Sequence, residues 1–398
     1  ALLRCPMKFL HFTPTDVGQY RIAILVNKIR KDDIIKEYLK PFGINQDDVI
    51  VIDLHQTPGK KKTTAAEMKR YINEELQGVL DDLKIEYVLC ADAEYFKALT
   101  KAPKADANIG YIMDSTYGAQ KVAYIPNFVN VFYDPDKVRA KIAQSVVALQ
   151  GHMVGSYIDP GQTIIKFADY PHTIEGIREW LLKLFQMPAL SCDIEAFSLK
   201  HHSAGIGTIT FCWNQEEGIA FPVDFLNKED RIIVRNMLRE FFEAYEGTLL
   251  YHSISYDVYV LIYQLFMEHI LDQEGLLHGL EVMLKNWHDT KLITYLATNS
   301  CAGNRLSLKE QAQEYAGNYA QEDIKDITKI PLPELLQYNL VDGLSTWYVF
   351  NKHYQTMIDD NQLEIYETIF KPAIVDIIQM QLTGLPVDMK RVKEVRPI

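Results

Sequence analysis

Short apolar runs alternate with amphipathic stretches from residue 19 to about residue 150. The runs predicted as strands are Arg21–Val26, Asp48–Leu54, Glu86–Cys90, Ile109–Met113 and Lys121–Ile125. The stretches predicted as helices are Asp33–Leu39, Thr64–Leu80, the residues after Cys90 as far as Leu99, and Asp136–Leu149. Strands that alternate with helices of this length are typical of an α/β domain with a mainly parallel sheet.

Glycine and proline interrupt this pattern between residues 151 and 172, which is typical of a linker. A second set of elements follows. Strands are predicted at Ala189–Ile194, Ile206–Trp213, Gly218–Val223 and Thr248–His252, with a hairpin between the second and third. Helices are predicted at Glu229–Tyr245, at Tyr256–Met267, and from Thr290 onward except around Gly303 and Pro331. The pattern therefore predicts a second α/β domain that differs from the first.

The composition narrows the class of protein. The chain has 398 residues, 48% of them hydrophobic and 24% charged, which favours two or three globular domains over a disordered chain. It contains no apolar run of the roughly 18 to 20 residues that cross a bilayer and no secretory signal pattern. The five cysteines are scattered and lack zinc-site spacing, which favours a reducing cytoplasm.

The net charge of −12 makes a general polyanion-binding surface unfavourable, but it allows a nucleic-acid enzyme whose acidic site holds metal ions. Neither GxGxxG nor the P-loop pattern occurs. The basic run Gly59–Lys62 is interpreted as a solvated loop rather than a phosphate contact.

Two carboxylates, Asp193 and Glu195, stand at the end of a predicted core strand. Residues i and i+2 of a strand share one face, so both side chains point the same way. Such a pair is costly inside a protein unless a divalent cation compensates it. Taken alone, the motif is better explained as a pair of carboxylates on an exposed strand, since such pairs are common.

Two further motifs carry acidic side chains. Asp257 follows the predicted strand that ends at His252, where a helix N-cap is the simple alternative. Tyr338 and Asp342 lie one turn apart in a predicted helix rich in leucine and valine, where an ordinary surface pair is the alternative. Together the four carboxylates and the tyrosine predict a two-metal phosphodiesterase site.

In this order the motifs resemble those of the DnaQ-like (DEDDy) 3′→5′ exonucleases, which have an RNase H-like fold. The three motifs are Asp193-x-Glu195, His252-x-x-x-Tyr256-Asp257 and Tyr338-x-x-x-Asp342. More narrowly, residues 185 to 398 resemble the proofreading domain of a bacteriophage family A DNA polymerase. Supporting similarities are Leu199, Asp289-Thr290, Leu306–Lys309 and the tail Met380–Asp388.

The resemblance implies a role for each motif residue. Asp193 would bridge two Mg²⁺ or Mn²⁺ ions, Glu195 and Asp342 would complete the tighter site, and Asp257 would hold the second ion. Tyr338 would orient the attacking water. The residues expected to contact or support the DNA 3′ end are Leu199, His252, Ser253 and Tyr256.

The sequence departs from the family at two points. The family usually has asparagine where this chain has Ser253. No polymerase carboxylates follow Asp388, which favours a fragment of a longer polymerase over a naturally separate exonuclease. At the other end the first methionine is Met7, so we expect residues 1 to 6 to be an addition or an upstream remnant.

We expect three segments: an α/β domain at 1–165, the exonuclease domain at 166–357, and the helical start of a polymerase region at 358–398. The first domain faintly resembles uracil-DNA glycosylases through Tyr124–Phe128, but it lacks their catalytic motifs. A scaffold or replisome-contact role is therefore favoured for it. The expected partners of the whole chain are a single-stranded or frayed DNA 3′ end and a C-terminal polymerase domain.

Two alternatives to proofreading remain open. One is a free-standing DEDDy exoribonuclease of the ribonuclease D type. The other is a catalytically inactive module retained for DNA binding or as a scaffold, which is disfavoured because all four carboxylates and the tyrosine are present.

Overall fold

The computed structural model describes residues 7–12, 20–56, 63–298, 305–319, 324 and 326–396. Residues 1–6, Gly303 and the basic run Gly59–Lys62 lie outside the described residues. The chain divides into two units. Unit 1 comprises Ala1–Thr163 with Gln313–Glu322, and unit 2 comprises Ile164–Ala312 with Asp323–Ile398.

Unit 1 is built on a mixed sheet. Among its described residues the sheet has six strands in the order β1-β3-β2-β4-β6-β5. Their bounds are β1 Phe9–His11, β2 Ile22–Val26, β3 Val49–Asp53, β4 Tyr87–Cys90, β5 Met113–Asp114 and β6 Lys121–Tyr124. The four inner strands are parallel, and the short edge strands β1 and β5 are antiparallel to their neighbours. The expected likeness to uracil-DNA glycosylases stays a prediction.

Helices cover both faces of this sheet. Their bounds are α1 Lys31–Ile34, η1 Ile35–Leu39, η2 Lys40–Phe42, η3 Gln46–Asp48, α2 Ala65–Tyr71, η4 Ile72–Leu76, α3 Gln77–Asp82, α4 Ala93–Thr100, η5 Asp106–Asn108, η6 Phe128–Phe132 and α5 Pro135–Met153. One core packs α2, α3 and α4 against one face, and a second packs α1, η1 and α5 against the other. Both faces are buried, which explains why the inner strands are continuous apolar runs.

A short segment from the later part of the chain also belongs to unit 1. It contains helix α13 (Gln313–Ala316), which follows α12 of unit 2. The Gln313 Nε2 donates to the Ile109 carbonyl oxygen at 2.8 Å, and the Asn318 Nδ2 donates to the Asn108 Oδ1 at 2.6 Å. The segment lies inside the range 166–357 expected for the exonuclease domain, so the sequence boundary differs from the structural division there.

Unit 2 contains the second sheet. Its described residues form six strands in the order β12-β11-β8-β9-β10-β7. Their bounds are β7 Phe167–Asp169, β8 Ala189–Glu195, β9 Thr208–Cys212, β10 Glu217–Pro222, β11 Thr248–Tyr251 and β12 Trp287–Asp289. Strands β8, β11 and β12 are parallel, and β9 is antiparallel to both β8 and β10. A mixed sheet with helices on both of its faces confirms the expected α/β fold class.

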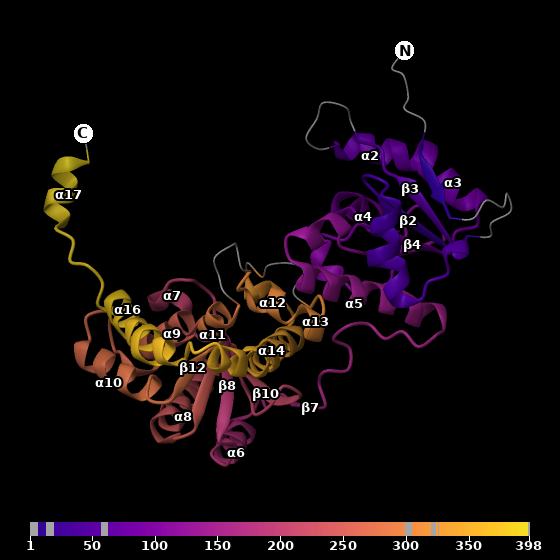
Figure 1. Cartoon of the computed structure of the whole chain (residues 1–398). Coiled ribbons are helices and arrows are strands. Elements are labelled where there is room, and N and C mark those ends of the chain that lie inside the picture. Colours follow the sequence, from indigo (N-terminus) through magenta and orange to yellow (C-terminus); the bar gives the residue numbers. More distant parts are fainter. Residues whose placement is uncertain are drawn as a thin grey trace. The chain divides into compact units, whose positions relative to one another are not determined.

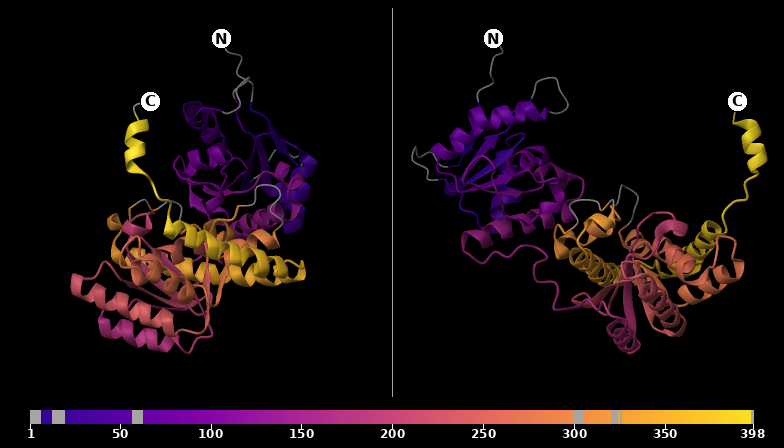
Figure 2. Two further views of the ribbon diagram at one scale, coloured as in Figure 1. Left: turned by 90° about the vertical axis from the view of Figure 1, so that its left-hand side faces the viewer. Right: turned by 180° about the vertical axis from the view of Figure 1, so that it is seen from behind.

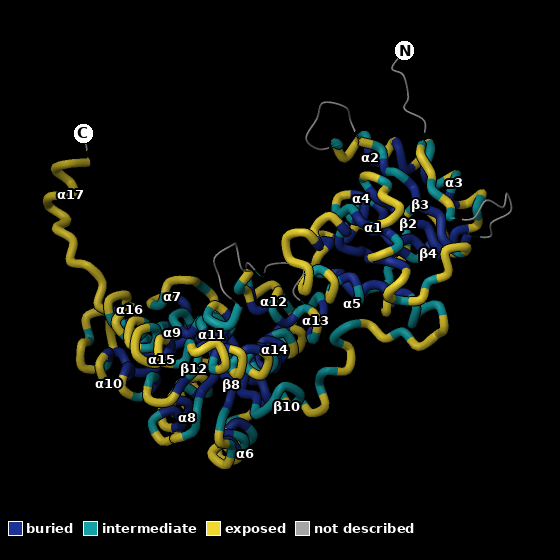
Figure 3. The backbone as a smooth tube through the Cα atoms, viewed as in Figure 1, coloured by how far each residue is buried: buried dark blue, intermediate teal, exposed yellow. Residues whose placement is uncertain are grey.

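The helices of unit 2 separate onto two faces of its sheet. Their bounds are α6 Ile174–Leu184, α7 His201–Ala204, α8 Lys228–Ala244, α9 Ile254–Phe266, α10 Gln273–Met283, α11 Thr290–Ala297, α12 Leu308–Gln311, η7 Ile327–Lys329, α14 Leu332–Asp359, α15 Leu363–Ile365, η8 Tyr366–Phe370, α16 Lys371–Thr383 and α17 Met389–Val395. The large core packs α6, α8, α9 and α10 against one face, and α14 packs against the other (Figures 1 and 2). The central strand β8 is therefore covered on both sides, as the burial colours of Figure 3 indicate.

The segment beyond residue 357, expected as the start of another region, packs in part on unit 2. Tyr366 is buried against α11 and α14, and Ile378 and Leu382 of α16 join the large core. From residue 383 to residue 396 the side chains are exposed. Among the described residues, no helix has both the length and the apolar character that crossing a membrane requires.

Candidate active site

The first two carboxylates project from the middle of the second sheet. Asp193 and Glu195 end strand β8, between β11 and β9. The alternating Cys192 and Ile194 enter the large core on the opposite face. The side-chain alternation of the strand therefore directs both carboxylates to the face that carries α14.

A close helix–strand contact brings the third carboxylate to them. Gly343 of α14 faces β9, where an added Cβ would lie 2.7 Å from the Cys212 Sγ and 2.9 Å from the Thr210 Cγ2. The absence of a side chain lets the helix lie directly on the strand. Asp342, the preceding residue, is 6% exposed, and its carboxylate oxygen lies within 4.8 Å of those of Asp193 and Glu195.

Asp257 joins the group from helix α9. Its Oδ1 accepts a hydrogen bond from the Ile194 backbone N–H at 3.4 Å, so it contacts the β8 strand beside the other two acids. The helix begins at Ile254 with Ser253 as the N-cap, which places Asp257 in the first turn. Asp257 is therefore not the N-cap of α9. Capping does not explain why its carboxylate is buried.

The pKa values of the clustered carboxylates are raised, because burial and mutual repulsion are not balanced by enough nearby positive charge. Burial raises the pKa of Asp193 to about 6. Burial and then the Asp193 charge raise the pKa of Glu195 to about 8, and the same two causes raise the pKa of Asp257 well above its usual range. Bound divalent cations would relieve both the desolvation and the repulsion. The oxygen-only donor set fits Mg²⁺ or Mn²⁺.

An asparagine that the sequence analysis did not single out holds Asp193 in place. Asn339 is fully buried on α14, and its Nδ2 donates to the Asp193 Oδ2 at 2.7 Å. Its Oδ1 accepts from the Thr208 hydroxyl at 2.9 Å, which fixes the orientation of the amide. A sequence signal was present, because Asn339 shares a helical face with Leu335 and Leu336, and a polar residue among core leucines needs partners.

A lysine also reaches the group. The Lys309 ammonium forms an ion pair with Asp342, and its Nζ lies 4.3 Å from the centroid of the Tyr338 ring. Tyr338, half-buried one turn before Asp342, is therefore next to the carboxylates, as its motif spacing predicts. In the sequence, Lys309 is marked only by the family similarity of Leu306–Lys309, which implies no role for it.

His252 occupies an internal position. Its Nδ1 is 2.8 Å from the Thr290 Oγ1, and its Nε2 is 2.9 Å from the Leu306 carbonyl oxygen. Burial lowers its pKa to about 3, so the ring is neutral near pH 7. Both ring nitrogens of His252 are therefore engaged inside the protein, and its expected role toward nucleic acid stays a prediction.

Ser253 has an unusual backbone conformation. Its φ of 69° and ψ of 53° lie in the left-handed region, where its N–H donates to the Asp289 Oδ1 at 3.0 Å. Asparagine tolerates this region better than serine. The asparagine that is usual here therefore has a conformational explanation, in addition to the substrate contact that the resemblance implies.

Replacing Ser253 with glycine should stabilise the protein. Glycine adopts a positive φ without a steric cost and keeps the N–H that Asp289 binds, so we expect Ser253→Gly to raise the free energy of unfolding by about 0.5–1 kcal/mol. Thermal or urea denaturation measures the change. Ser255→Gly is the matched control, because Ser255 lies inside helix α9 and glycine should destabilise there. A loss of stability in Ser253→Gly would contradict the backbone argument.

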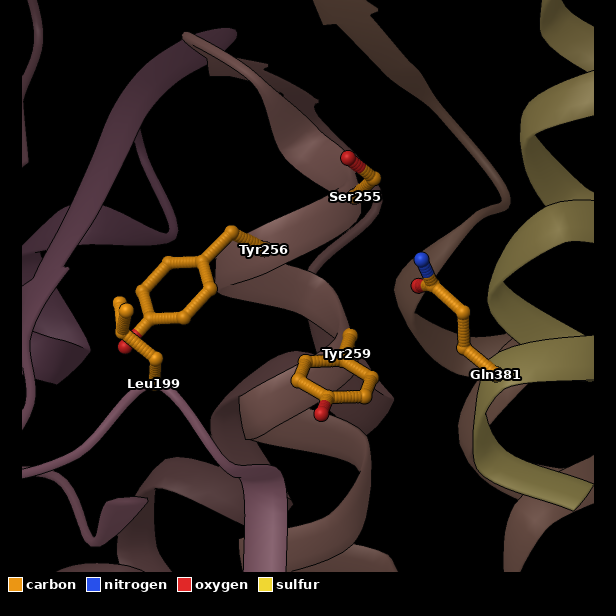
Figure 4. A pocket seen from close by; sticks show the side chains of 5 residues that line it. All are labelled: Leu199, Ser255, Tyr256, Tyr259 and Gln381. Carbon is orange, nitrogen blue, oxygen red and sulfur yellow. The ribbon is translucent and has the colours of Figure 1, made fainter. Parts of the chain in front are cut away.

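Two of the four side chains expected at the nucleic-acid end, Leu199 and Tyr256, line a hollow of about 330 Å³, which Ser255, Tyr259 and Gln381 complete. His252 and Ser253 do not line it. Figure 4 shows Tyr256 beside Leu199, with Gln381 facing the hollow from α16. Leu199 is 83% exposed, and the Tyr256 hydroxyl donates to the Ser198 carbonyl oxygen at 3.1 Å. The structure thus joins two expected residues, Leu199 and Tyr256, in one open hollow on the same unit as the carboxylates.

Comparison with known proteins finds several solved structures of low similarity to this chain. No protein-family model matches the chain. Among similar solved structures, Brucella melitensis NrnC bound to pGG is 16% identical over 57% of this chain and 98% of its own, with a TM-score of 0.40. Trypanosoma brucei RNase D in complex with RNA U12 is 16% identical over 60% and 81%, with a TM-score of 0.37. Escherichia coli RNase D, an exoribonuclease, is 15% identical over 55% and 52%, with a TM-score of 0.34.

Proposed function

We propose that this chain is a 3′→5′ exonuclease that hydrolyses the terminal phosphodiester of a single-stranded nucleic acid and releases nucleoside monophosphates. The observation that carries the proposal is the convergence of Asp193, Glu195 and Asp342, with Asp257 contacting the same strand. Four acids from one strand and two helices are gathered where burial disfavours their charge. A protein gains nothing in stability from such a cluster, so a catalytic purpose is the better explanation.

The residues fit two divalent cations. Asp193, Glu195 and Asp342 would hold the first, and Asp193 with Asp257 would hold the second. Bound in this way, the cations would lower the pKa of a water molecule and stabilise the negative charge that develops on the phosphate oxygens.

The remaining residues orient these groups. The Asn339 amide fixes one oxygen of Asp193, so that the other is free to point toward the cluster. The Tyr338 hydroxyl would hydrogen-bond the attacking water, since its ring lies beside Lys309 and one turn before Asp342. The buried His252 and the Asp289 carboxylate hold the turn before α9, and with it Asp257.

The hollow at Leu199 and Tyr256 suits the terminal bases of a strand. An exposed leucine beside an aromatic ring offers apolar contact to a base face that has left a duplex stack. We therefore propose single-stranded or frayed 3′ ends as the substrate.

Hydrolysis at phosphorus follows the same chemistry in DNA and in RNA. One observation supports a DNA substrate, and another supports an RNA substrate. The tail Met380–Asp388 favours proofreading beside a polymerase. An exoribonuclease fits at least as well, since pGG and RNA U12 are bound in two of the similar structures.

The experiment uses 5′-labelled single-stranded DNA and RNA of one sequence, incubated with the whole chain and Mg²⁺. We expect a ladder that shortens from the 3′ end. The substrate that is degraded at the higher rate shows whether the enzyme prefers DNA or RNA. An oligonucleotide cut internally, or neither one shortened, would contradict the proposal.

Tyr338→Phe should lower the rate of hydrolysis less than loss of a carboxylate does. The variant keeps the ring that packs beside Lys309 and removes only the hydroxyl that orients water. Single-turnover digestion measures the rate, with Tyr348→Phe on the same helix as the control. A Tyr338→Phe rate as low as that of an Asp193 variant would require a different role for the tyrosine.

A further inference from the structure

Lys309 is placed where a cation is needed. Its ammonium pairs with Asp342, whose carboxylate lies within 4.8 Å of those of Asp193 and Glu195. The lysine side chain is 30% exposed and that of Asp342 is 8% exposed. The lysine thus reaches a buried carboxylate while part of its own side chain remains in contact with solvent. The charge of Lys309 also acts on Asp193 and Glu195. One flexible side chain thus offsets part of the repulsion among three acids.

Under the proposed function, a divalent cation would bind the same Asp342 carboxylate that Lys309 pairs with. A lysine ammonium and a hydrated metal ion both seek carboxylate oxygens, and they cannot share one oxygen without repulsion. Lysine carries its charge on a long, rotatable stem, so it can withdraw toward solvent without a change in the backbone.

We propose that Lys309 is an internal counter-cation that occupies the carboxylate cluster in the metal-free protein and must be displaced when a divalent ion binds. The inference rests on the proposed function for the identity of the ion, but it concerns binding rather than hydrolysis. The metal-free cluster is held together by the lysine, and metal entry has to overcome this contact. The apparent dissociation constant for metal then equals the intrinsic one divided by the fraction of molecules in which the lysine has withdrawn, so it is raised when that fraction is small.

Cation–π packing explains why the lysine stays in this place. The Lys309 Nζ lies 4.3 Å from the centroid of the Tyr338 ring, close enough for the ring face to stabilise the ammonium. The ring therefore supports the ammonium on one side while Asp342 binds it on the other.

The test measures Mn²⁺ binding to the whole chain by calorimetry and by the electron paramagnetic resonance of free Mn²⁺. We expect Lys309→Met, which keeps the apolar stem and removes the charge, to bind Mn²⁺ about tenfold more tightly than the unmodified chain. Lys309→Arg should keep the weaker affinity, because it keeps the charge. Lys329→Met is the matched control, since Lys329 is 81% exposed and pairs with Asp326 instead. Equal or weaker Mn²⁺ binding by Lys309→Met would overturn the proposal.

Thermal melting gives a second readout. In EDTA, Lys309→Met should melt below the unmodified chain, because the acids lose their counter-cation. At saturating Mn²⁺ the difference should shrink or vanish. A difference of the same size in both conditions would assign Lys309 a purely structural role and overturn the proposal.

These measurements separate the two proposals. If Lys309→Met binds Mn²⁺ more tightly but the unmodified chain degrades no nucleic acid, the exonuclease proposal fails while the counter-cation proposal stands. If nucleic acid is degraded but Mn²⁺ affinity is unchanged by Lys309→Met, the reverse holds.

Discussion

Asp193→Asn should reduce hydrolysis by about three orders of magnitude or more, which corresponds to a loss of about 4 kcal/mol of transition-state stabilisation. The charge of Asp193 acts on both Glu195 and Asp257, and under the proposed function Asp193 would hold both cations. The amide is nearly the same size as the carboxylate, and its oxygen can still accept the hydrogen bond from Asn339. Packing is therefore kept while the charge is lost. Rates are compared by single-turnover digestion at saturating Mg²⁺.

The same substitution should not harm the fold. The raised pKa of Asp193 means that its ionised form costs stability in the metal-free protein, and this cost appears as the pH rises through about 6. Above that pH, Asp193→Asn in EDTA should melt at the same temperature as the unmodified chain or higher. Asp376→Asn, at an exposed position of α16, is the matched control for rate and stability. Near-normal hydrolysis by Asp193→Asn would refute the assignment of the site.

Asn339→Ala should have the second-largest effect, a loss of about 10–100-fold in hydrolysis or metal affinity. Partners that orient a metal ligand typically contribute this much. The substitution removes the 2.7 Å hydrogen bond to Asp193 and also leaves the buried Thr208 hydroxyl without its acceptor, at a cost of about 1–3 kcal/mol in stability. Mn²⁺ titration and digestion report the first effect, and thermal melting reports the second.

The double variant Asn339→Ala with Thr208→Val separates the two effects. Removing the hydroxyl along with its partner should recover part of the lost stability, while metal affinity stays low. Asn351→Ala, at an exposed position of the same helix, should change neither quantity. Recovery of metal affinity in the double variant would show that Asn339 acts through stability alone.

Hydrophobic patterning was sufficient to predict the inner strands of unit 1, because runs such as Ile22–Val26 and Val49–Asp53 are almost wholly buried. The strands that it missed are β1, β7 and β12, which have three residues each and depend on neighbouring strands rather than on their own composition. The run Ile109–Met113 was predicted as a strand, yet only Met113–Asp114 pairs as one.

Helix prediction failed for different reasons. Helix α10 has buried Leu276, Leu280 and Met283 at helical spacing, so its signal was present in the sequence but was not used. Helix α9 begins two residues before its predicted start, because the positive φ of Ser253 and the carboxylate of Asp289 initiate it. A side chain that is 36 residues away in the sequence cannot be inferred from local patterning.

In the candidate site, too, residues with a local sequence pattern were predicted, and residues defined by contacts distant in sequence were not. The acids were found because carboxylates at strand ends and at helical spacing are locally visible. Asn339 and Lys309 were not assigned roles, because their partners Asp193 and Asp342 lie 146 and 33 residues away. Such contacts depend on how α12 and α14 pack, which tertiary structure decides.

The most direct test of the two-metal exonuclease is digestion of a 3′-mismatched primer-template, labelled at the 5′ end of the primer, first with Mg²⁺ and then with excess EDTA. We predict a ladder that shortens from the 3′ end in Mg²⁺, stops in EDTA and is absent for Asp193→Asn. Shortening that continues in EDTA, or an intact primer in Mg²⁺ despite tight binding, would contradict this prediction.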